Sequence, residues 1–156
     1  MPRTYVITGS ASGIGLATSE RVRAAGDRVI GIDLRGSDID ADLSTPTGRA
    51  DAATRAMEMA DGVVDAVIAC AGIAAPIAKT ISINYFGVTE FVTALLPALA
   101  QSDAPRAAVV SSMASLQANS PELVAAALSG DEDEAVRIAE EIAARGPEAG
   151  YAIYPS

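Results

Sequence analysis

The sequence predicts an α/β fold built on a doubly wound parallel sheet, because short apolar runs alternate with helical patterns along the chain. Two further observations support this prediction: the first apolar run opens into a glycine-rich turn, and the second ends in a carboxylate. The expected strands are Tyr5–Thr8, Arg28–Asp33, Val63–Cys70 and Ala107–Ser112. The expected helices are Gly13–Ala25, Pro46–Ala60 and Ile81–Ala100.

The first strand runs into three glycines, Gly9, Gly13 and Gly15, and then into a helical pattern. Without a Cβ, these residues can take positive φ and let the backbone approach a ligand closely. The helix start adds free N–H groups and a partial positive charge, which suit a pyrophosphate. The turn is therefore a candidate phosphate site, and an ordinary tight turn is the alternative. The spacing differs from the commoner Gly-x-Gly-x-x-Gly pattern, so the turn needs further support.

The second strand ends at Asp33, which lies 24 positions after Gly9. Dinucleotide folds place an acidic residue near this point to bind the hydroxyls of the adenosine ribose. A carboxylate there would repel a 2′-phosphate, so Asp33 favours NAD over NADP. Arg35 could soften that discrimination, but no Lys or Arg lies inside the glycine turn. The alternative is a plain acidic residue in a loop at the strand end.

A short extended piece, Ile39–Leu43, precedes the helix that begins near Pro46. The third strand runs into Ala71 and Gly72, where small side chains would allow close approach to a ligand. Cys70 reads as a small buried apolar residue, because it has no histidine or metal partner to activate it.

The pattern Ile81–Ala100 places one asparagine, Asn84, on an otherwise apolar helical stripe. The stripe continues through Val88, Phe91, Leu95 and Leu99. Asn84 is either a core residue bonded to a carbonyl or a functional group. The fourth strand ends in Ser111 and Ser112, at the edge where open α/β sheets bind ligands; a serine pair that starts a turn is the alternative.

Residues 117–150 break the strand–helix rhythm and predict a helical insertion. A short helix begins at Ser120 and ends near Gly130, and a second follows the acidic run Asp131–Glu134. That run is expected to cap the helix rather than to bind a metal. The apolar stripe of the second helix is Ala135, Ile138, Ala139 and Ile142.

The composition excludes several classes of site. The chain has 156 residues, a net charge of −9, no histidine and one cysteine. It therefore lacks a Ser-His-Asp triad, a His-ligated metal and a cysteine-cluster zinc site, and no metal is expected. The acidic balance argues against nucleic acid as a partner. We expect one domain, residues 1–156, with no membrane span and no signal pattern, and hence a cytoplasmic protein.

Together, the Thr8–Gly15 turn, Asp33, the run Cys70–Gly72, Asn84 and the run Val110–Ser115 resemble the classical short-chain dehydrogenase/reductase family. Cys70 stands where that family usually has asparagine. The run Gly31–Arg35, the run Ala41–Thr45, the run Asn84–Gly87 and the insertion after Ser115 resemble its bacterial hydroxysteroid dehydrogenases and carbonyl reductases.

The resemblance implies a Rossmann-like fold and an NAD-dependent oxidoreductase that acts on small-molecule secondary alcohols and ketones, with steroid-like compounds as one class. By resemblance, Tyr154 gives a proton to the carbonyl oxygen, Ser112 hydrogen-bonds it, and Asn84 helps to hold a water. The residues expected to bind NAD are Gly9, Ser12, Gly13, Ile14, Gly15, Asp33, Asp42, Leu43, Ala71 and Gly72.

The chain departs from the family pattern at its end. The family pairs its tyrosine with a lysine four residues later, but Tyr151 is followed at that distance by Pro155. Tyr154 would need a lysine two residues beyond Ser156. We therefore expect a sheet truncated at its C-terminal side, in the N-terminal part of a longer protein. A non-catalytic dinucleotide-binding module is the alternative. A third hypothesis makes the insertion an interface of a homo-oligomer, a dimer or a tetramer.

Overall fold

The computed structural model describes residues 2–156, which divide into two compact units. The sheet unit comprises residues 2–71 and 87–110. The helical unit comprises residues 72–86 and 111–156. Each unit has its own cluster of buried hydrophobic side chains.

The sheet unit contains a five-stranded, entirely parallel sheet in the order β3-β2-β1-β4-β5. Its strands are β1 (Thr4–Thr8), β2 (Arg28–Asp33), β3 (Ile39–Asp40), β4 (Ala66–Ala69) and β5 (Arg106–Val109). The chain moves outward from β1 in one direction and then returns to build β4 and β5 on the other side. The order therefore reverses between β1 and β4, which is the switch point where doubly wound sheets bind ligands.

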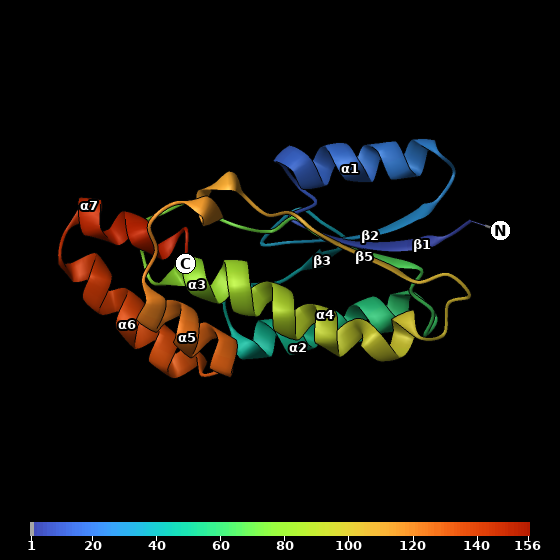
Figure 1. The fold of residues 1–156 in the computed structure, drawn as a ribbon. Coiled ribbons are helices and arrows are strands. Elements are labelled where there is room, and N and C mark those ends of the chain that lie inside the picture. The colour runs from blue at the N-terminus through green and yellow to red at the C-terminus, as the bar shows by residue number, and fades with distance from the viewer. Residues whose placement is uncertain (1) are drawn as a thin grey trace. The chain divides into compact units, whose positions relative to one another are not determined.

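Three helices cover the sheet. Helix α1 (Gly13–Ala24) lies on one face, and α2 (Pro46–Met59) and α4 (Gly87–Leu99) lie side by side on the other (Figure 1). This arrangement confirms the predicted doubly wound, Rossmann-like fold. The helix start of α1 follows the carboxyl end of β1 after a turn of only four residues.

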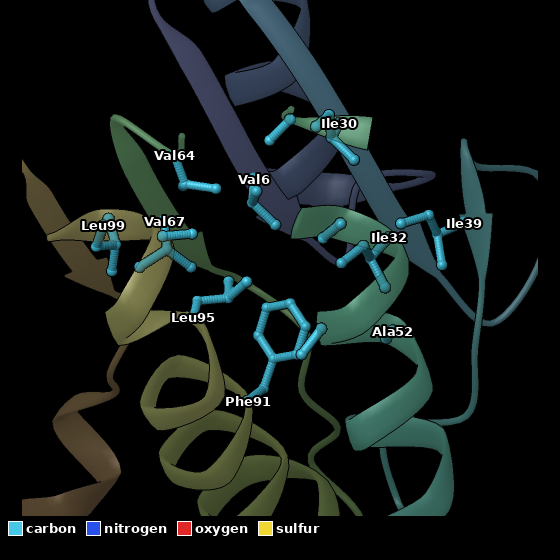
Figure 2. Close-up of a cluster of buried hydrophobic side chains, with 14 of the residues drawn as sticks. Val6, Ile30, Ile32, Ile39, Ala52, Val64, Val67, Phe91, Leu95 and Leu99 are labelled. Atoms are coloured by element: carbon cyan, nitrogen blue, oxygen red, sulfur yellow. The ribbon is translucent and has the colours of Figure 1, made fainter. Parts of the chain in front are cut away.

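The core of the sheet unit lies between the strands and the helices α2 and α4. Figure 2 shows the side chains of β1, β2 and β4 facing Phe91, Leu95 and Leu99 of α4. Small residues such as Ala52, which is fully buried, line the side of α2 that packs there. Burying these apolar groups away from water is the main force that holds the helices on the sheet.

Two predicted strands are shorter than expected. The run Val63–Cys70 forms β4 only over Ala66–Ala69, because Val64 N donates to Ala98 O rather than to a strand. The run Ala107–Ser112 forms a strand only up to Val109, and the last ladder bond joins Val110 N to Ala69 O. Beyond Ala69, β4 has ended, so within residues 2–156 it offers β5 no further ladder partner.

The predicted helix Ile81–Ala100 is not one regular α-helix. It consists of α3 (Lys79–Ile81), the π-helical turn η1 (Ser82–Phe86) and α4. A π-turn adds a residue per turn and shifts the phase of the stripe. Asn84 and Val88 of the predicted stripe are only partly buried, whereas Phe91, Leu95 and Leu99 are buried.

This helical segment, Lys79–Leu99, has 21 residues, and the mean hydropathy of an 18-residue window within it is 1.2, so it is long and apolar enough to cross a membrane by length and composition. One such helix is weak evidence for the membrane span that the sequence analysis does not expect. The apolar side chains of α4, however, fill the core under the sheet (Figure 2). A core helix meets the same test of length and composition.

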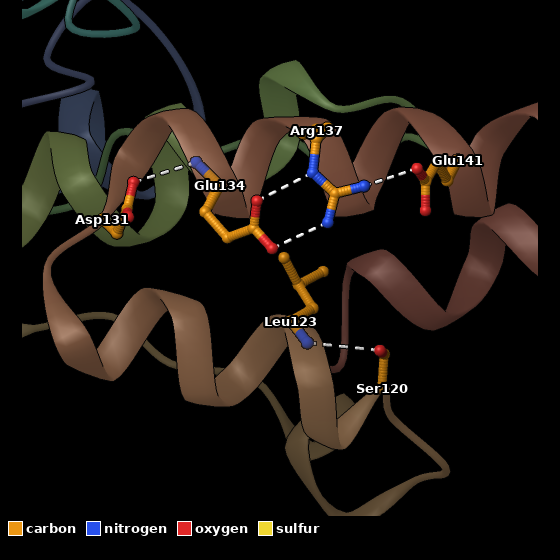
Figure 3. A network of polar contacts seen from close by, with 6 residues as sticks. All are labelled: Ser120, Leu123, Asp131, Glu134, Arg137 and Glu141. Carbon is orange, nitrogen blue, oxygen red and sulfur yellow. Dashed lines mark hydrogen bonds and ion pairs between the residues drawn. The ribbon is translucent and has the colours of Figure 1, made fainter.

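The helical unit contains the predicted hairpin of two helices. Its elements are η2 (Met113–Leu116), α5 (Pro121–Ser129), α6 (Glu132–Ala144), α7 (Pro147–Gly150) and η3 (Tyr151–Ile153). Ser120 and Asp131 cap the two helices by accepting from Leu123 N and Glu134 N (Figure 3). The caps confirm the predicted helix starts. The short turns α7 and η3 were not predicted, because Gly146 and Pro147 read only as a stop.

The apolar stripe of α6 is used inside the helical unit. Ala135 and Ala139 are fully buried, and Ile142 is nearly so. They share a core with Leu123 of α5 and Ile81 of α3. Most of this stripe is therefore used inside the helical unit, while Ile138 is partly buried, and packing of the insertion on a second subunit stays a prediction.

Candidate cofactor and active site

The glycine turn brings backbone segments into direct contact. Gly9 has φ +69°, and a Cβ placed on it would lie 2.9 Å from Ala71 N. A Cβ on Gly15 would clash with Gly9 O. Gly13 has φ +51° but has open space around it. Two of the three glycines thus serve packing between β1, α1 and the end of β4, and the third serves backbone conformation.

The N-terminus of α1 has no side-chain cap. Ser12 occupies the N-cap position in an extended conformation, and its hydroxyl accepts no hydrogen bond from the helix. Ile14 in the first turn is 62% exposed. The first N–H groups of the helix therefore have no side-chain acceptor, which leaves them available to an anion.

Asp33 is held at the edge of this turn. Its Oδ2 accepts from Ala11 N at 3.0 Å, and its Oδ1 accepts from Leu34 N at 2.7 Å. Each carboxylate oxygen keeps a lone pair beyond the one that it uses here. The structure thus brings Asp33 and the glycine turn together, as the sequence predicts.

A second link between the turn and the chain after β2 was not predicted. Ser10 Oγ and Ser37 Oγ lie 2.8 Å apart in a hydrogen bond. Ser10 N also donates to Ile32 O at 3.2 Å. Serines are common in loops, so the sequence carried no signal that these two meet.

The side chain of Thr8 holds the end of β4, a role that the sequence did not predict. Its Oγ1 accepts from the backbone N–H groups of both Cys70 and Ala71, each at 3.1 Å. Thr8 is 1% exposed, so this hydroxyl satisfies two donors in the interior of the sheet unit. Burial raises the pKa of the Cys70 thiol, which agrees with an unreactive, apolar side chain.

Asp42 and Leu43 follow β3, where Ala41 N donates to Asp33 O at 2.8 Å. Asp42 Oδ1 accepts from Ser44 N and Ser44 Oγ at 3.0 and 2.6 Å. The side chain of Leu43 belongs to the core and is 6% exposed. Only its backbone is therefore left for contact with a ligand.

Arg49 is a buried cation beneath this loop, and the sequence did not predict it. Arg49 is 1% exposed, its Nε lies 2.7 Å from Glu90 Oε2, and its Nη1 donates to Leu43 O at 3.2 Å. Only the arginine of this pair is buried, because the Glu90 side chain is 46% exposed, and the pair links α2 to α4. The helical pattern alone gave no reason to expect an arginine in the interior.

In the helical unit, both ends of the Asn84 side-chain amide form hydrogen bonds with the backbone of Ile73. Its Oδ1 accepts from Ile73 N at 2.9 Å, and its Nδ2 donates to Ile73 O at 2.8 Å. A Cβ on Gly72 would approach Asn84 Oδ1 to 3.2 Å. The structure therefore brings Gly72 and Asn84 together and supports the reading of an asparagine bonded to a carbonyl.

Ser112 begins the turn η2 rather than ending a strand. Its Oγ accepts from Ala114 N at 3.1 Å, which makes it the cap of that turn. The residue is exposed. Its hydroxyl proton remains available for donation, because the cap uses only a lone pair.

Tyr154 directly follows η3 and is partly buried. Next to it, Ser156 Oγ donates to Ala152 O at 2.6 Å and accepts from Ser120 N at 2.9 Å. These bonds tie the tyrosine segment to the start of α5. Within residues 2–156, the side chains of Ser112, Asn84 and Tyr154 share no hydrogen bond.

Residues 3–127 match the short chain dehydrogenase family. The chain is 38% identical over 152 residues to 3-alpha-hydroxysteroid dehydrogenase/carbonyl reductase of Comamonas testosteroni. That alignment covers 94% of this chain and 59% of the relative. The chain thus spans about three fifths of the length of this curated relative.

Among solved structures, the chain is similar to 3-alpha-hydroxysteroid dehydrogenase from Pseudomonas sp., a complex with NADH. The TM-score is 0.86 at 39% identity, over 97% of this chain and 66% of that one. An aldohexose dehydrogenase from Thermoplasma acidophilum matches with a TM-score of 0.66 at 19% identity, over 95% of this chain and 63% of that one. At that identity the second match speaks for the fold alone.

Proposed function

Because the chain belongs to the short chain dehydrogenase family, we propose that its protein is an NAD-dependent oxidoreductase acting on secondary alcohols and ketones. One observation carries the proposal: an uncapped helix start and a glycine turn lie beside a carboxylate at the switch point of the sheet. Donors for a diphosphate and an acceptor for ribose hydroxyls are the two features by which a dinucleotide is recognised.

The residues present fit that cofactor. A side chain larger than hydrogen at Gly9 or Gly15 would fill the cradle or clash with its backbone. The N–H groups of the first turn of α1 would bind the diphosphate, and Asp33 would accept the ribose hydroxyls. The carboxylate would repel a 2′-phosphate, which favours NAD over NADP. The NADH complex of the related Pseudomonas enzyme supports the same choice.

When bound, the nicotinamide ring supplies or accepts the hydride. As a ketone is reduced, negative charge builds on its oxygen, and a positioned donor must neutralise it. We assign the proton to the Tyr154 hydroxyl and a hydrogen bond on the same oxygen to the Ser112 hydroxyl. Asn84 has both ends of its amide on Ile73, so we assign it the positioning of the Gly72–Ile73 backbone.

The substrate class is proposed from the named relatives. Two of them are 3-alpha-hydroxysteroid dehydrogenases, at 38% and 39% identity. We propose bulky, steroid-like secondary alcohols and ketones as substrates of this protein. These relatives are dehydrogenases, which favours an enzyme over a non-catalytic dinucleotide-binding module. Assembly into a homo-oligomer and a cytoplasmic location stay predictions.

The test compares Tyr154→Phe with Tyr151→Phe in the full-length protein, using the loss of NADH absorbance with 3-ketosteroids. Removing a general acid should lower kcat by about 10²- to 10⁴-fold while leaving the Kd for NADH unchanged. Tyr151 is 55% exposed and serves as the matched control. Full activity in Tyr154→Phe would refute the assignment of the proton donor. Binding of NADH without turnover of any ketone in the parent would favour the non-catalytic module.

A further inference from the structure

The loop that follows β2, residues 34–38, is fastened directly to the glycine turn. Ser37 Oγ shares a hydrogen bond of 2.8 Å with Ser10 Oγ, and Ser10 is 7% exposed. This bond spans 27 residues of sequence, so it is a tertiary contact rather than a local turn. It connects the candidate phosphate site to the segment just past Asp33.

Glycine at position 31 makes this approach possible. A Cβ there would lie 2.5 Å from Ser10 Oγ and 3.4 Å from Asp38 Oδ2. Asp38 Oδ2 accepts from Gly31 N at 2.7 Å, and Ser37 N donates to Asp40 Oδ1 at 3.2 Å. The loop therefore packs against β2 at Gly31. This is the one glycine of the strand, so no side chain keeps the loop away.

The tip of the loop lies between two fixed points. Asp33 is bonded to Ala11 N on one side, and Ser37 is bonded to Ser10 on the other. Between them, Leu34 is 55% exposed, Arg35 is exposed, and Gly36 has φ +77°. The tip itself is thus held mainly through its ends.

Two opposite charges, Asp33 at the end of β2 and Arg35 in the tip, would compete for the adenosine end of a dinucleotide. The Asp33 carboxylate suits free ribose hydroxyls, whereas an arginine accommodates a 2′-phosphate. Which of them faces the ribose depends on the path of the chain between Asp33 and Ser37. A contact that fixes this path therefore acts on cofactor choice without touching the cofactor.

We propose that Ser10 and Ser37 are positioning residues which, through their shared hydrogen bond, hold the loop so that Asp33 rather than Arg35 meets the adenosine ribose. The inference rests on the proposed NAD-binding function. It adds a specificity determinant outside the acidic residue itself: the hydroxyl pair sets the preference for the unphosphorylated dinucleotide.

The test measures Kd for NADH and for NADPH by calorimetry on the parent, Ser10→Ala, Ser37→Ala and the double variant. A net hydrogen bond of this kind corresponds to about a 3- to 10-fold change in an equilibrium constant. In Ser37→Ala we expect the Kd for NADH to rise by that factor and the Kd for NADPH to change less than about twofold. The double variant should be no worse than either single one, because the two changes remove the same bond.

Two control variants separate positioning from general damage. Ser37→Thr retains a hydroxyl and should restore the parental ratio of the two dissociation constants. Ser129→Ala removes a hydroxyl that donates to Ala126 O in α5, and it should leave both constants unchanged.

The outcomes distinguish this inference from the proposed function. The positioning role alone would be overturned if the parent binds NADH and Ser37→Ala binds both cofactors with the same Kd values as the parent. An equal loss of affinity for NADH and NADPH would also overturn it, because a general loosening has no preference. A parent that binds neither dinucleotide would overturn the proposed function, and the positioning role with it.

Discussion

The sheet unit and the helical unit hold their candidate functional residues in different ways. In the sheet unit, the glycine turn is set by backbone against backbone, as where Gly9 meets Ala71 and Gly15 meets Gly9. In the helical unit, the Ser112 hydroxyl is set by a short-range bond of its own turn, and the segment of Tyr154 is tied to α5 through Ser156. Asn84 is intermediate, since its side chain reaches 11 residues back to Ile73.

The difference follows from how each region is supported. The glycine turn joins β1, whose Val6 and Ile7 are fully buried, to a helix that packs on the sheet. The turn cannot change its conformation without disturbing buried side chains and the hydrogen bonds of the strands. Ser112 follows β5, and its hydroxyl is held by the bond to Ala114 N in the turn that it begins. The glycine turn is thus held by packing across the sheet unit, whereas the Ser112 hydroxyl is held by a bond within its own turn.

The largest expected effect is that of Gly15→Ala in the glycine turn. The new methyl group would meet Gly9 O, which is backbone inside the turn and cannot rotate away. We expect a loss of at least about 3 kcal/mol in the free energy of unfolding, with NADH binding abolished. Thermal melting and an NADH titration would measure both effects.

Gly13→Ala is the matched control within the same turn. A Cβ there meets nothing within 4 Å, so only its φ of +51° opposes the change. The expected cost is about 1–2 kcal/mol, that of a left-handed alanine. If the two variants lost equal stability, backbone packing would not be what forms the cradle.

A smaller effect is expected for Asn84→Leu in the helical unit. The change would leave both Ile73 N and Ile73 O without their side-chain partner. Partly buried groups that lose a hydrogen bond should lower the free energy of unfolding by about 2 kcal/mol, as measured in urea. Asn84→Asp keeps the acceptor for Ile73 N but sets a carboxylate oxygen against Ile73 O, so it should also be destabilising. Asn119→Ala, at an exposed position, should change nothing; a loss as large as that of Asn84→Leu would contradict the role of this amide.

The smallest effects concern two carboxylates, one in each unit. Hydrogen bonds from Ser102 and from Thr4 N hold the pKa of Asp65 below its usual range. The hydrogen bond and charge of Arg137 lower the pKa of Glu134, which is exposed (Figure 3). A lowered folded-state pKa contributes stability above the unfolded pKa, and that stability is lost as the pH falls through the folded value.

Asp65→Asn and Glu134→Gln should therefore flatten the loss of stability between about pH 5 and about pH 2. Salt separates the two sites, because exposed pairs are screened and backbone hydrogen bonds are not. The effect of Glu134→Gln should vanish in about 1 M NaCl, and that of Asp65→Asn should persist. Urea titrations over this pH range, at low salt and in about 1 M NaCl, would measure the free energy of unfolding of each variant. Equal salt sensitivity at both sites would mean that the Asp65 bonds add nothing beyond simple charge attraction.

Much of the fold was predictable, because each part rests on a local signal. Apolar runs ending in Gly9 and Asp33 predict strands that end at one edge, and Ser120 and Asp131 predict helix starts. The π-turn at Ser82–Phe86 was not predictable, because the spacing of its residues also fits an α-helix. Nor was the early end of β5 at Val109, which depends on where its neighbour stops.

The candidate site divides in the same manner. The sequence alone determined the chemistry that is available: three glycines at a helix start, an acidic residue at a strand end and no histidine. These are properties of residue type and spacing, which the chain carries before it folds. Only the tertiary structure decided that Ser10 meets Ser37, that Thr8 holds the end of β4 and that Arg49 is buried. Such contacts join residues far apart in sequence, so they exist only after the sheet has brought its strand ends together.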